Sequence, residues 1–225
     1  MIKKEHRYNT IIFDLDGTLL NTIEDITDAV NYSLINNGII GQNVSINEVK
    51  YFVGSGVDNL IKRLMVSKKL GDKYFDSLKK DYLVQYVLVQ KDKTRPYDGI
   101  IDLLTDLNNS GIKIAVISNK PQDDVERIIN YYFKEVKFDA IVGATPNIPI
   151  KPNPQVVYNT INLLQADIKK TLYIGDSDVD MKTAKNSNLD SIGVLWGFRT
   201  KEELEKENAM YIVSTTDEIK KIINI

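Results

Sequence analysis

The stretch Ile11–Leu20, "IIFDLDGTLL", places two carboxylates, Asp14 and Asp16, directly behind an apolar run. The apolar run has the length and composition of a buried strand. Moving an ionised carboxylate out of water costs several kcal/mol unless a cation or hydrogen-bond donors pair with it. Two acids at the end of such a strand therefore predict a positively charged partner at that place.

Short apolar runs of the same kind recur along the chain, and they predict strands over residues 10–14, 112–118, 138–143, 171–176 and 191–196. Each run is rich in Ile, Val or Tyr with little polar alternation, as expected of strands that are covered on both faces. Apolar stripes at helical spacing lie between them and predict helices over residues 99–107, 122–131 and 156–164. Strands that alternate with helices predict an α/β fold, a doubly wound parallel sheet with a Rossmann-like core.

One region interrupts this alternation. Residues 21–95 carry helical patterns and no convincing strand, with a capping-box signature at Ser45–Glu48 and a turn between helices at residues 53–57. We therefore expect an inserted α-helical cap domain, with chain crossings near Asn21 and near residues 94–99. The predicted organisation is a discontinuous catalytic core of residues 1–20 and 96–225 and a helical cap of residues 21–95.

Composition excludes several classes of function. The 225 residues include 29 basic and 31 acidic side chains, so the net charge of −2 gives no general attraction to nucleic acid or to an anionic membrane. The absence of cysteine excludes disulfides, thiolate metal sites and thiol nucleophiles. No apolar stretch approaches the ~18 residues of a membrane span, and the basic leader "MIKKEHRYNT" lacks the apolar region of a signal peptide. We expect a cytoplasmic monomer or homodimer without nucleic-acid or membrane partners.

Polar motifs follow four of the predicted strands. They are "DLDGT" after the first, "SNKP" at residues 118–121, "KPNP" at residues 151–154 and "GDSDVD" at residues 175–180. Ligands of open α/β sheets bind beyond the carboxyl ends of the strands. We therefore expect acids, a hydroxyl and a lysine to gather at one edge of the sheet.

These residue types suit phosphoryl transfer. Asp14 can attack phosphorus and form an aspartyl-phosphate, which divides one difficult displacement into two easier ones. Asp16 can protonate the leaving oxygen and later accept a proton from the hydrolytic water. Two carboxylates beside an anionic phosphate require a hard cation, and Asp176 supplies a further oxygen ligand, so we predict Mg²⁺ as the cofactor.

A second group of residues is expected to bind the phosphate. Lys151, the Ser118 hydroxyl and the Asn119 amide can offset charge on the phosphoryl oxygens in the transition state. Gly17 allows the backbone to approach the phosphate closely. Thr18, the next residue along the chain, completes the predicted phosphate-binding set.

The four motifs, in this order and at roughly this spacing, resemble the haloacid dehalogenase superfamily, and more narrowly its phosphoglycolate phosphatase-like members with a helical cap. "VGSG" (53–56), "RPYDG" (95–99) and "GVLWGFRT" (193–200) resemble the narrower group as well. The resemblance covers nearly the whole chain.

The resemblance implies roles for single residues. Asp14 is implied as the nucleophile and Asp16 as the acid/base. Mg²⁺ is implied to be bound by Asp14, the backbone carbonyl of Asp16, and Asp176, with Asp180 supporting the waters of the metal. In the cap, Lys50 stands where similar phosphatases often carry Arg, and a lysine cannot hold a carboxylate bidentately.

The implied activity is hydrolysis of a small phosphorylated metabolite, with 2-phosphoglycolate as the first candidate. The turn Gly54-Ser55-Gly56 offers free backbone N–H groups close to a substrate, and Lys50 offers a charge for a carboxylate. Arg199 is open between a loop cation and a substrate contact. Alternatives are an inorganic pyrophosphatase or a sugar-phosphate phosphatase or mutase of the same superfamily, a haloalkanoate dehalogenase, and a non-catalytic phosphate-accepting signalling domain.

Overall fold

A computed structural model of the protein describes residues 6–225. Residues 1–5, which are the start of the predicted core segment and the first half of the basic leader, lie outside the described residues. Within residues 6–225, no helix is long and apolar enough to cross a membrane.

A parallel sheet of six strands, in the order β5-β4-β1-β6-β7-β8, forms the centre of the described chain. The strands are β1 Thr10–Phe13, β4 Lys113–Pro121, β5 Ala140–Ala144, β6 Thr171–Gly175, β7 Asp190–Val194 and β8 Tyr211–Val213. All five predicted strands are present, and the predicted α/β fold is confirmed. The analysis of the sequence missed β8, because three residues are too few to show a period.

The central strand β1 marks the point where the chain changes direction across the sheet. It pairs with β4 on one side and with β6 on the other, and all of its residues are buried. Strands β4 and β5 extend the sheet one way, and β6 to β8 extend it the other way. Ligands bind at such a reversal in α/β sheets, so this topology places "DLDGT" where a site is expected.

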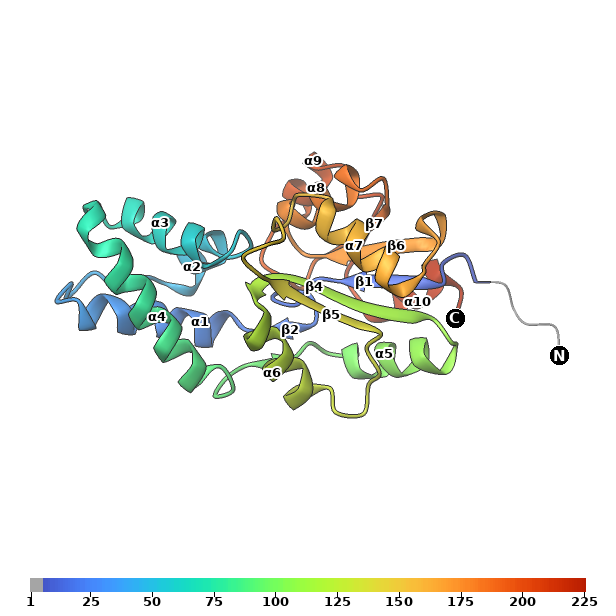
Figure 1. The fold of residues 1–225 in the computed structure, drawn as a ribbon, viewed down its shortest axis with the longest axis horizontal. Helices are drawn as coiled ribbons and strands as arrows, with labels where there is room; N and C mark the ends of the chain where they lie inside the picture. The colour runs from blue at the N-terminus through green and yellow to red at the C-terminus, as the bar shows by residue number, and fades with distance from the viewer. Residues whose placement is uncertain (1–5) are drawn as a thin grey trace.

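Helices cover both faces of the sheet (Figure 1). They are α5 Ile100–Asn109, α6 Gln122–Tyr132, α7 Gln155–Leu164, α8 Asp178–Asn186, α9 Lys201–Lys206 and α10 Thr216–Ile223. Alternate residues of β1 point to opposite faces: Ile12 joins a core cluster with Val157 of α7, and Phe13 joins the cluster that holds Leu103 of α5. The three helices predicted between strands are confirmed.

The region between β2 (Leu20–Asn21) and β3 (Arg95–Pro96), called the helical region below, is helical as predicted and lies to the left of the sheet in Figure 1. Its helices are α1 Ile23–Asn36, α2 Ile46–Phe52, α3 Val57–Ser67 and α4 Phe75–Val89, with a 3₁₀ turn, η1, at Asp72–Tyr74. Helices α1 and α4 pack against each other, and the buried apolar residues of all four helices belong to the larger core cluster. The predicted capping box at Ser45 and Glu48 starts α2.

The two chain crossings lie side by side. Strands β2 Leu20–Asn21 and β3 Arg95–Pro96 pair antiparallel, with Leu20 opposite Pro96 and Asn21 opposite Arg95. Sequence patterns could not indicate these strands, because two residues carry no periodicity. The pair lies at residues 20–21 and 95–96, where the crossings between core and cap were expected. The division of the chain at residues 21–95 stays our proposal.

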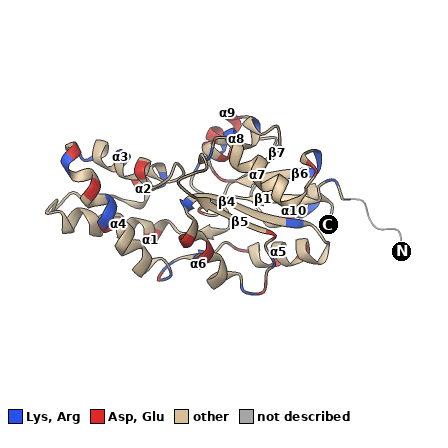
Figure 2. Cartoon of the chain, in the orientation of Figure 1, with Lys and Arg blue, Asp and Glu red and all other residues tan. Residues whose placement is uncertain are grey.

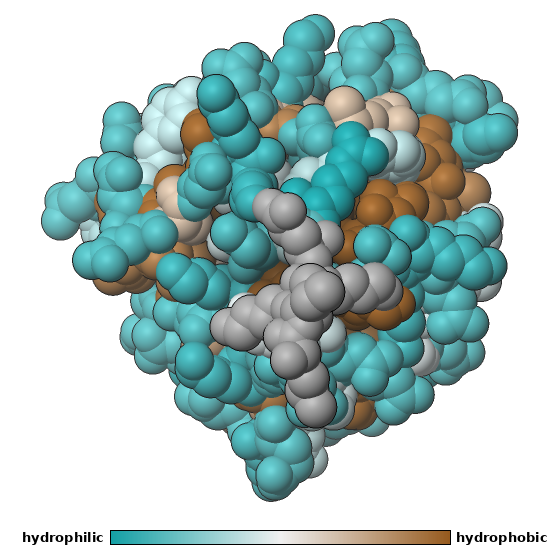
Figure 3. All heavy atoms as spheres, turned by 90° about the vertical axis from the view of Figure 1, so that its right-hand side faces the viewer, coloured by the Kyte–Doolittle hydropathy of each residue, from teal (hydrophilic) through white to brown (hydrophobic). Residues whose placement is uncertain are grey.

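The surface carries charges of both signs on the helical region and on the sheet region (Figure 2). The end of the molecule that faces away from α1–α4 is covered largely by hydrophilic side chains (Figure 3). In Figure 2, Lys and Arg are interspersed with Asp and Glu, in keeping with the net charge of −2.

Asp25 ties the start of α1 to the second crossing. Its side chain is fully buried, and its carboxylate accepts hydrogen bonds from the backbone N–H of Lys93 at 3.0 Å and from Thr94, whose backbone N–H and hydroxyl lie at 2.8 and 2.7 Å. Buried donors that lose their acceptor are costly. Asp25 therefore holds the two ends of the helical region together.

We predict that Asp25→Ala lowers the free energy of unfolding by about 3 kcal/mol, because the buried N–H groups lose their acceptor. The control is Asp28→Ala, which removes an exposed ion pair with Lys93 and should cost less than about 1 kcal/mol. Urea denaturation followed by circular dichroism measures both. Equal losses in the two variants would contradict the anchoring role of Asp25.

Candidate active site

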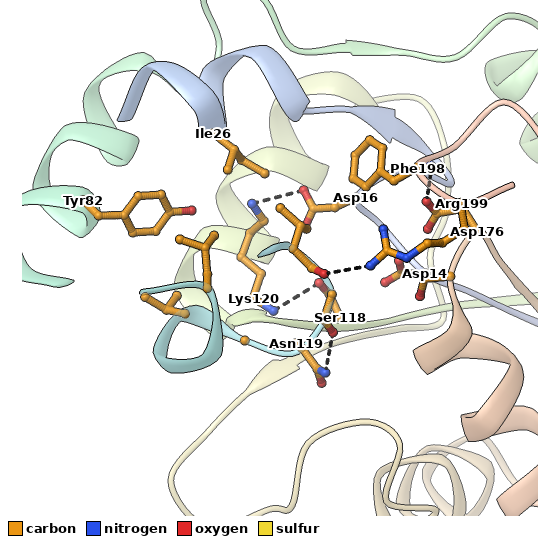
Figure 4. Close-up of a pocket in the computed structure, with 16 residues that line it drawn as sticks. Asp14, Asp16, Ile26, Tyr82, Ser118, Asn119, Lys120, Asp176, Phe198 and Arg199 are labelled. Carbon is orange, nitrogen blue, oxygen red and sulfur yellow. Dashed lines mark hydrogen bonds and ion pairs between the residues drawn. The ribbon is translucent and has the colours of Figure 1, made fainter. Parts of the chain in front are cut away.

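The polar motifs converge at the carboxyl ends of the central strands, facing the helical region (Figure 4). A cavity of about 50 Å³ lies there. One wall comes from the end of β4 and from the loops after β1, β6 and β7, and it carries the polar side chains. The other wall comes from α1–α4 and is mainly apolar, with Ile26, Leu60 and Tyr82 among its residues.

Three buried carboxylates form a cluster at the strand ends. Asp14 follows β1, Asp176 follows β6, and Asp180 lies in the first turn of α8. One oxygen of each carboxylate lies within 4.8 Å of the others. Asp180 is held in place by Ser177, whose hydroxyl and backbone N–H donate to the same oxygen at 2.6 and 3.1 Å.

Lys151 is the buried cation of this cluster. Its Nζ lies 2.7 Å from Asp14 and 2.8 Å from Asp180. Burial alone would lower the pKa of Lys151, but the two carboxylates raise it well above its ordinary value, so the ammonium stays charged. Asn119 fixes the backbone of Lys151, because its side-chain amide accepts from the Lys151 N–H and donates to the Lys151 carbonyl.

The three carboxylates carry more charge than Lys151 balances. Burial and the charge of Asp180 raise the pKa of Asp14 to about 7, although Lys151 opposes this. Burial and the two neighbouring acids also raise the pKa of Asp176 well above its ordinary value. Hard oxygen donors with excess negative charge are what a divalent cation such as Mg²⁺ prefers. The residues of the cluster therefore fit the predicted metal.

Glycine backbone surrounds Asp176 closely. A Cβ on Gly17, whose φ is +87°, would lie 2.2 Å from a carboxylate oxygen of Asp176, and a Cβ on Gly197 would lie 2.2 Å from its Cβ. Neither position tolerates a side chain. Gly17 was expected to make room for the phosphate, and in the structure its missing side chain makes room for Asp176.

Asp16 lies apart from the carboxylate cluster and lines the cavity. Its Oδ1 accepts a hydrogen bond from the Thr22 hydroxyl at 2.6 Å and lies 3.2 Å from Nζ of Lys120. A carboxyl group beside the cavity, and separate from Lys151, can exchange protons with a bound molecule. The arrangement supports the acid/base role that we proposed for Asp16, which stays a proposal.

The predicted phosphate-binding residues fall into two groups. Ser118 and Asn119 line the cavity, and the side chain of Asn119 is engaged with the backbone of Lys151. Thr18 is fully buried and is absent from the residues that line the cavity. Its hydroxyl lies 3.5 Å from Asp176 and donates toward it. The structure therefore brings Ser118 and Asn119 to the cavity and places Thr18 behind Asp176.

Only some of the predicted substrate contacts of the helical region line the cavity. Gly54 and Gly56 line the cavity, whereas Lys50 and Ser55 do not. The Ser55 hydroxyl accepts a hydrogen bond from Arg63 at 3.1 Å. Helix α2 buries Val49 and Phe52, which leaves Lys50 on another face of the helix.

Two cations of the cavity wall had no assigned role. Lys120 is the next-to-last residue of β4, inside the quoted "SNKP" motif, and a charged residue in a buried strand was the signal in the sequence that could have identified it. Arg199, left open between two interpretations, is buried and lines the cavity. It donates to the Lys50 carbonyl at 2.6 Å and lies 3.5 Å from Asp178.

Comparison with known proteins identifies similar sequences and structures. A family model for haloacid dehalogenase-like hydrolases matches residues 11–194. A phosphoglycolate phosphatase of Aquifex aeolicus is 31% identical, covering 84% of this chain and 85% of its own. A provisionally assigned pyrophosphatase of Caldanaerobacter subterraneus is 25% identical, covering 96% of this chain and 95% of its own. A crystal structure of a provisionally assigned phosphoglycolate phosphatase from Lactobacillus delbrueckii superposes with a TM-score of 0.91 at 31% identity, covering 97% of this chain and 100% of the other.

We predict that Mg²⁺ raises the melting temperature and that the gain grows from pH 5 to pH 8. Without metal, the pKa of Asp14 is about 7 in the folded chain against 3.8 for an unperturbed carboxyl. The folded state then binds a proton that the unfolded state lacks, so stability falls as pH rises through this window. Bound Mg²⁺ removes that cost.

Thermal unfolding at three pH values, with and without MgCl₂, measures the effect. Asp176→Asn should lose most of the Mg²⁺-dependent gain, because it removes one ligand charge. An Mg²⁺ response that is unchanged in Asp176→Asn would place the metal elsewhere.

Proposed function

The chain belongs to the haloacid dehalogenase-like hydrolases, and from this membership we propose that it is a Mg²⁺-dependent phosphatase of small phosphomonoesters, with 2-phosphoglycolate as the main substrate. The observation that carries this proposal is the position of Asp14. Its carboxylate lies 2.7 Å from the Lys151 ammonium and lines a cavity whose wall also holds Asp16. A nucleophile, a cation and a separate proton donor thus share one site.

The proposed reaction has two steps. In the first, an oxygen of Asp14 bonds to phosphorus, the bond to the leaving oxygen breaks, and Asp16 gives that oxygen a proton. In the second, water attacks phosphorus and gives a proton to Asp16, the bond between phosphorus and the Asp14 oxygen breaks, and phosphate and the Asp14 carboxylate are released. Lys151 offsets negative charge on the phosphoryl oxygens in both steps.

Mg²⁺ is proposed to be held by Asp14 and Asp176, with the Asp16 carbonyl as a further ligand and Asp180 beside it. When bound, the metal supplies positive charge that lets the anionic phosphate approach the carboxylates. The residues of the chain perform the remaining tasks. Ser177 orients Asp180, and the Phe198 N–H orients Asp176 through a hydrogen bond of 2.7 Å.

The size and charge of the cavity support a small anionic substrate. The cavity volume of about 50 Å³ favours a small ester over a nucleotide. Arg199, a buried cation, lines the cavity beyond the carboxylate cluster. It favours a substrate with a second anionic group, which agrees with the named activity of the Aquifex aeolicus relative.

We predict that the purified protein with Mg²⁺ releases phosphate from 2-phosphoglycolate with a kcat/KM at least about tenfold above those for pyrophosphate, sugar phosphates and p-nitrophenyl phosphate. Asp14→Asn should lower turnover by about a thousandfold or more, because it removes the attacking charge and keeps the shape. The control is Asp123→Asn, an exposed acid in the first turn of α6. Pyrophosphate as the best substrate would overturn the substrate assignment, and an active Asp14→Asn would overturn the mechanism.

A second prediction concerns the acid/base. In Asp16→Ala, kcat/KM for 2-phosphoglycolate should fall at least about tenfold more than kcat/KM for p-nitrophenyl phosphate, whose leaving group departs without a proton. The ratio kcat/KM reports the first step, in which the leaving oxygen is protonated. Phosphate release from both substrates measures it. Equal losses would assign Asp16 to the metal site and remove its role as acid.

A further inference from the structure

Lys120 is a buried cation that the reaction as proposed does not use. It lies near the end of β4, and its side chain is 7% exposed. Its Nζ lies 3.2 Å from Oδ1 of Asp16, as Figure 4 shows. The same oxygen of Asp16 accepts the hydroxyl of Thr22 at 2.6 Å. Two donors therefore hold one oxygen of the proposed acid/base.

The other partner of Lys120 comes from the helical region. Nζ donates to the hydroxyl of Tyr86, on α4, at 2.7 Å and lies 4.1 Å from the centre of its ring. Burial raises the pKa of Tyr86 well above its ordinary value, so the phenol stays neutral and accepts the hydrogen bond. The ring of Tyr86 stacks on Tyr82, with centroids 5.8 Å apart, and Tyr82 lines the cavity.

Lys120, Asn119 and Arg199 of the core each donate a hydrogen bond to the helical region around the cavity. Asn119 donates to the Gly54 carbonyl at 2.9 Å, and Arg199 donates to the Lys50 carbonyl at 2.6 Å. The acceptors of these two hydrogen bonds are backbone carbonyl oxygens. The contact from Lys120 to Tyr86 differs, because Lys120 also pairs with the carboxylate of Asp16.

We propose that Lys120 is a positioning residue for the acid–base step, and that Tyr86 of the helical region holds its ammonium against Asp16. This inference rests on the proposed phosphatase function. When Asp16 gives its proton to the leaving oxygen, a negative charge forms on its carboxylate. The ammonium of Lys120 offsets that charge and keeps the carboxylate in place to accept a proton from water in the second step.

The position of Lys120 explains why a lysine is needed there. A neutral side chain would leave Thr22 as the remaining described donor to the acid, and it would not oppose the charge that develops during proton transfer. The effect of Lys120 should therefore depend on the leaving group. Esters whose leaving oxygen needs a proton should depend on Lys120, and p-nitrophenyl phosphate should not.

The test compares Lys120→Met, which keeps the length of the side chain, with the unchanged protein on three substrates. These are 2-phosphoglycolate, ethyl phosphate and p-nitrophenyl phosphate. We expect kcat/KM to fall about tenfold for the two alkyl esters and less than about threefold for the aryl ester. In an Asp16→Ala background, Lys120→Met should cause almost no further loss, because the group it serves is gone.

Tyr86→Phe is the second variant, since it removes one oxygen and keeps the stacked ring. It should give a smaller loss of the same selectivity, about threefold on the alkyl esters. Circular dichroism and the Mg²⁺-dependent gain in melting temperature verify that each variant is folded with an intact carboxylate cluster.

The outcomes separate this inference from the proposed function. A loss confined to 2-phosphoglycolate, with ethyl phosphate unaffected, would make Lys120 a contact for the substrate carboxylate and overturn the inference. Equal losses on all three substrates, or a full further loss in the Asp16→Ala background, would also overturn it while leaving the phosphatase function intact. An unchanged protein that hydrolyses none of the three would overturn the proposed function and the inference with it.

Discussion

The contact between Lys151 and the carboxylates of Asp14 and Asp180 is the interaction on which the site depends. These groups are almost completely removed from water. The desolvation free energy of either the lysine or the carboxylates would be too unfavourable without the opposite charge beside it. Lys151 balances part of the negative charge, and the excess on Asp14, Asp176 and Asp180 remains for a divalent cation. The same imbalance that raises the pKa of Asp14 thus makes the cluster suited to a divalent cation.

The sheet brings the carboxylates of the cluster together. Asp14 follows β1 and Asp176 follows β6, and the two strands pair in parallel, so both acids emerge at the same edge. Close approach then requires glycine, and Gly17 and Gly197 leave room for the Asp176 carboxylate. Asn119, near the end of β4 on the other side of β1, fixes the backbone of Lys151. The charged centre is therefore built by backbone geometry on three neighbouring segments.

The helical region completes the site with a different kind of surface. It contributes apolar side chains and glycine backbone to the cavity, while the cations of the wall come from the core. Lys120 and Arg199 each reach from the core to the helical region, one to the Tyr86 hydroxyl and one to the Lys50 carbonyl. The two parts of the chain thus share their polar contacts at the cavity, and the paired segments β2 and β3 join them beside it.

The sequence by itself determined the α/β order of elements, the helical region between the first two long strands, and the acids and lysine of the carboxylate cluster. These features rest on local patterns, namely apolar periodicity and motifs that directly follow strands. The short strands β2, β3 and β8 carried no such pattern. The hydrogen-bond partners of Lys120 and Arg199, and the positions of Lys50 and Thr18 away from the cavity, follow from how the helices pack on the sheet. Tertiary structure decided these points, because residues 34 or 149 positions apart meet by the packing of elements, which no local spacing encodes.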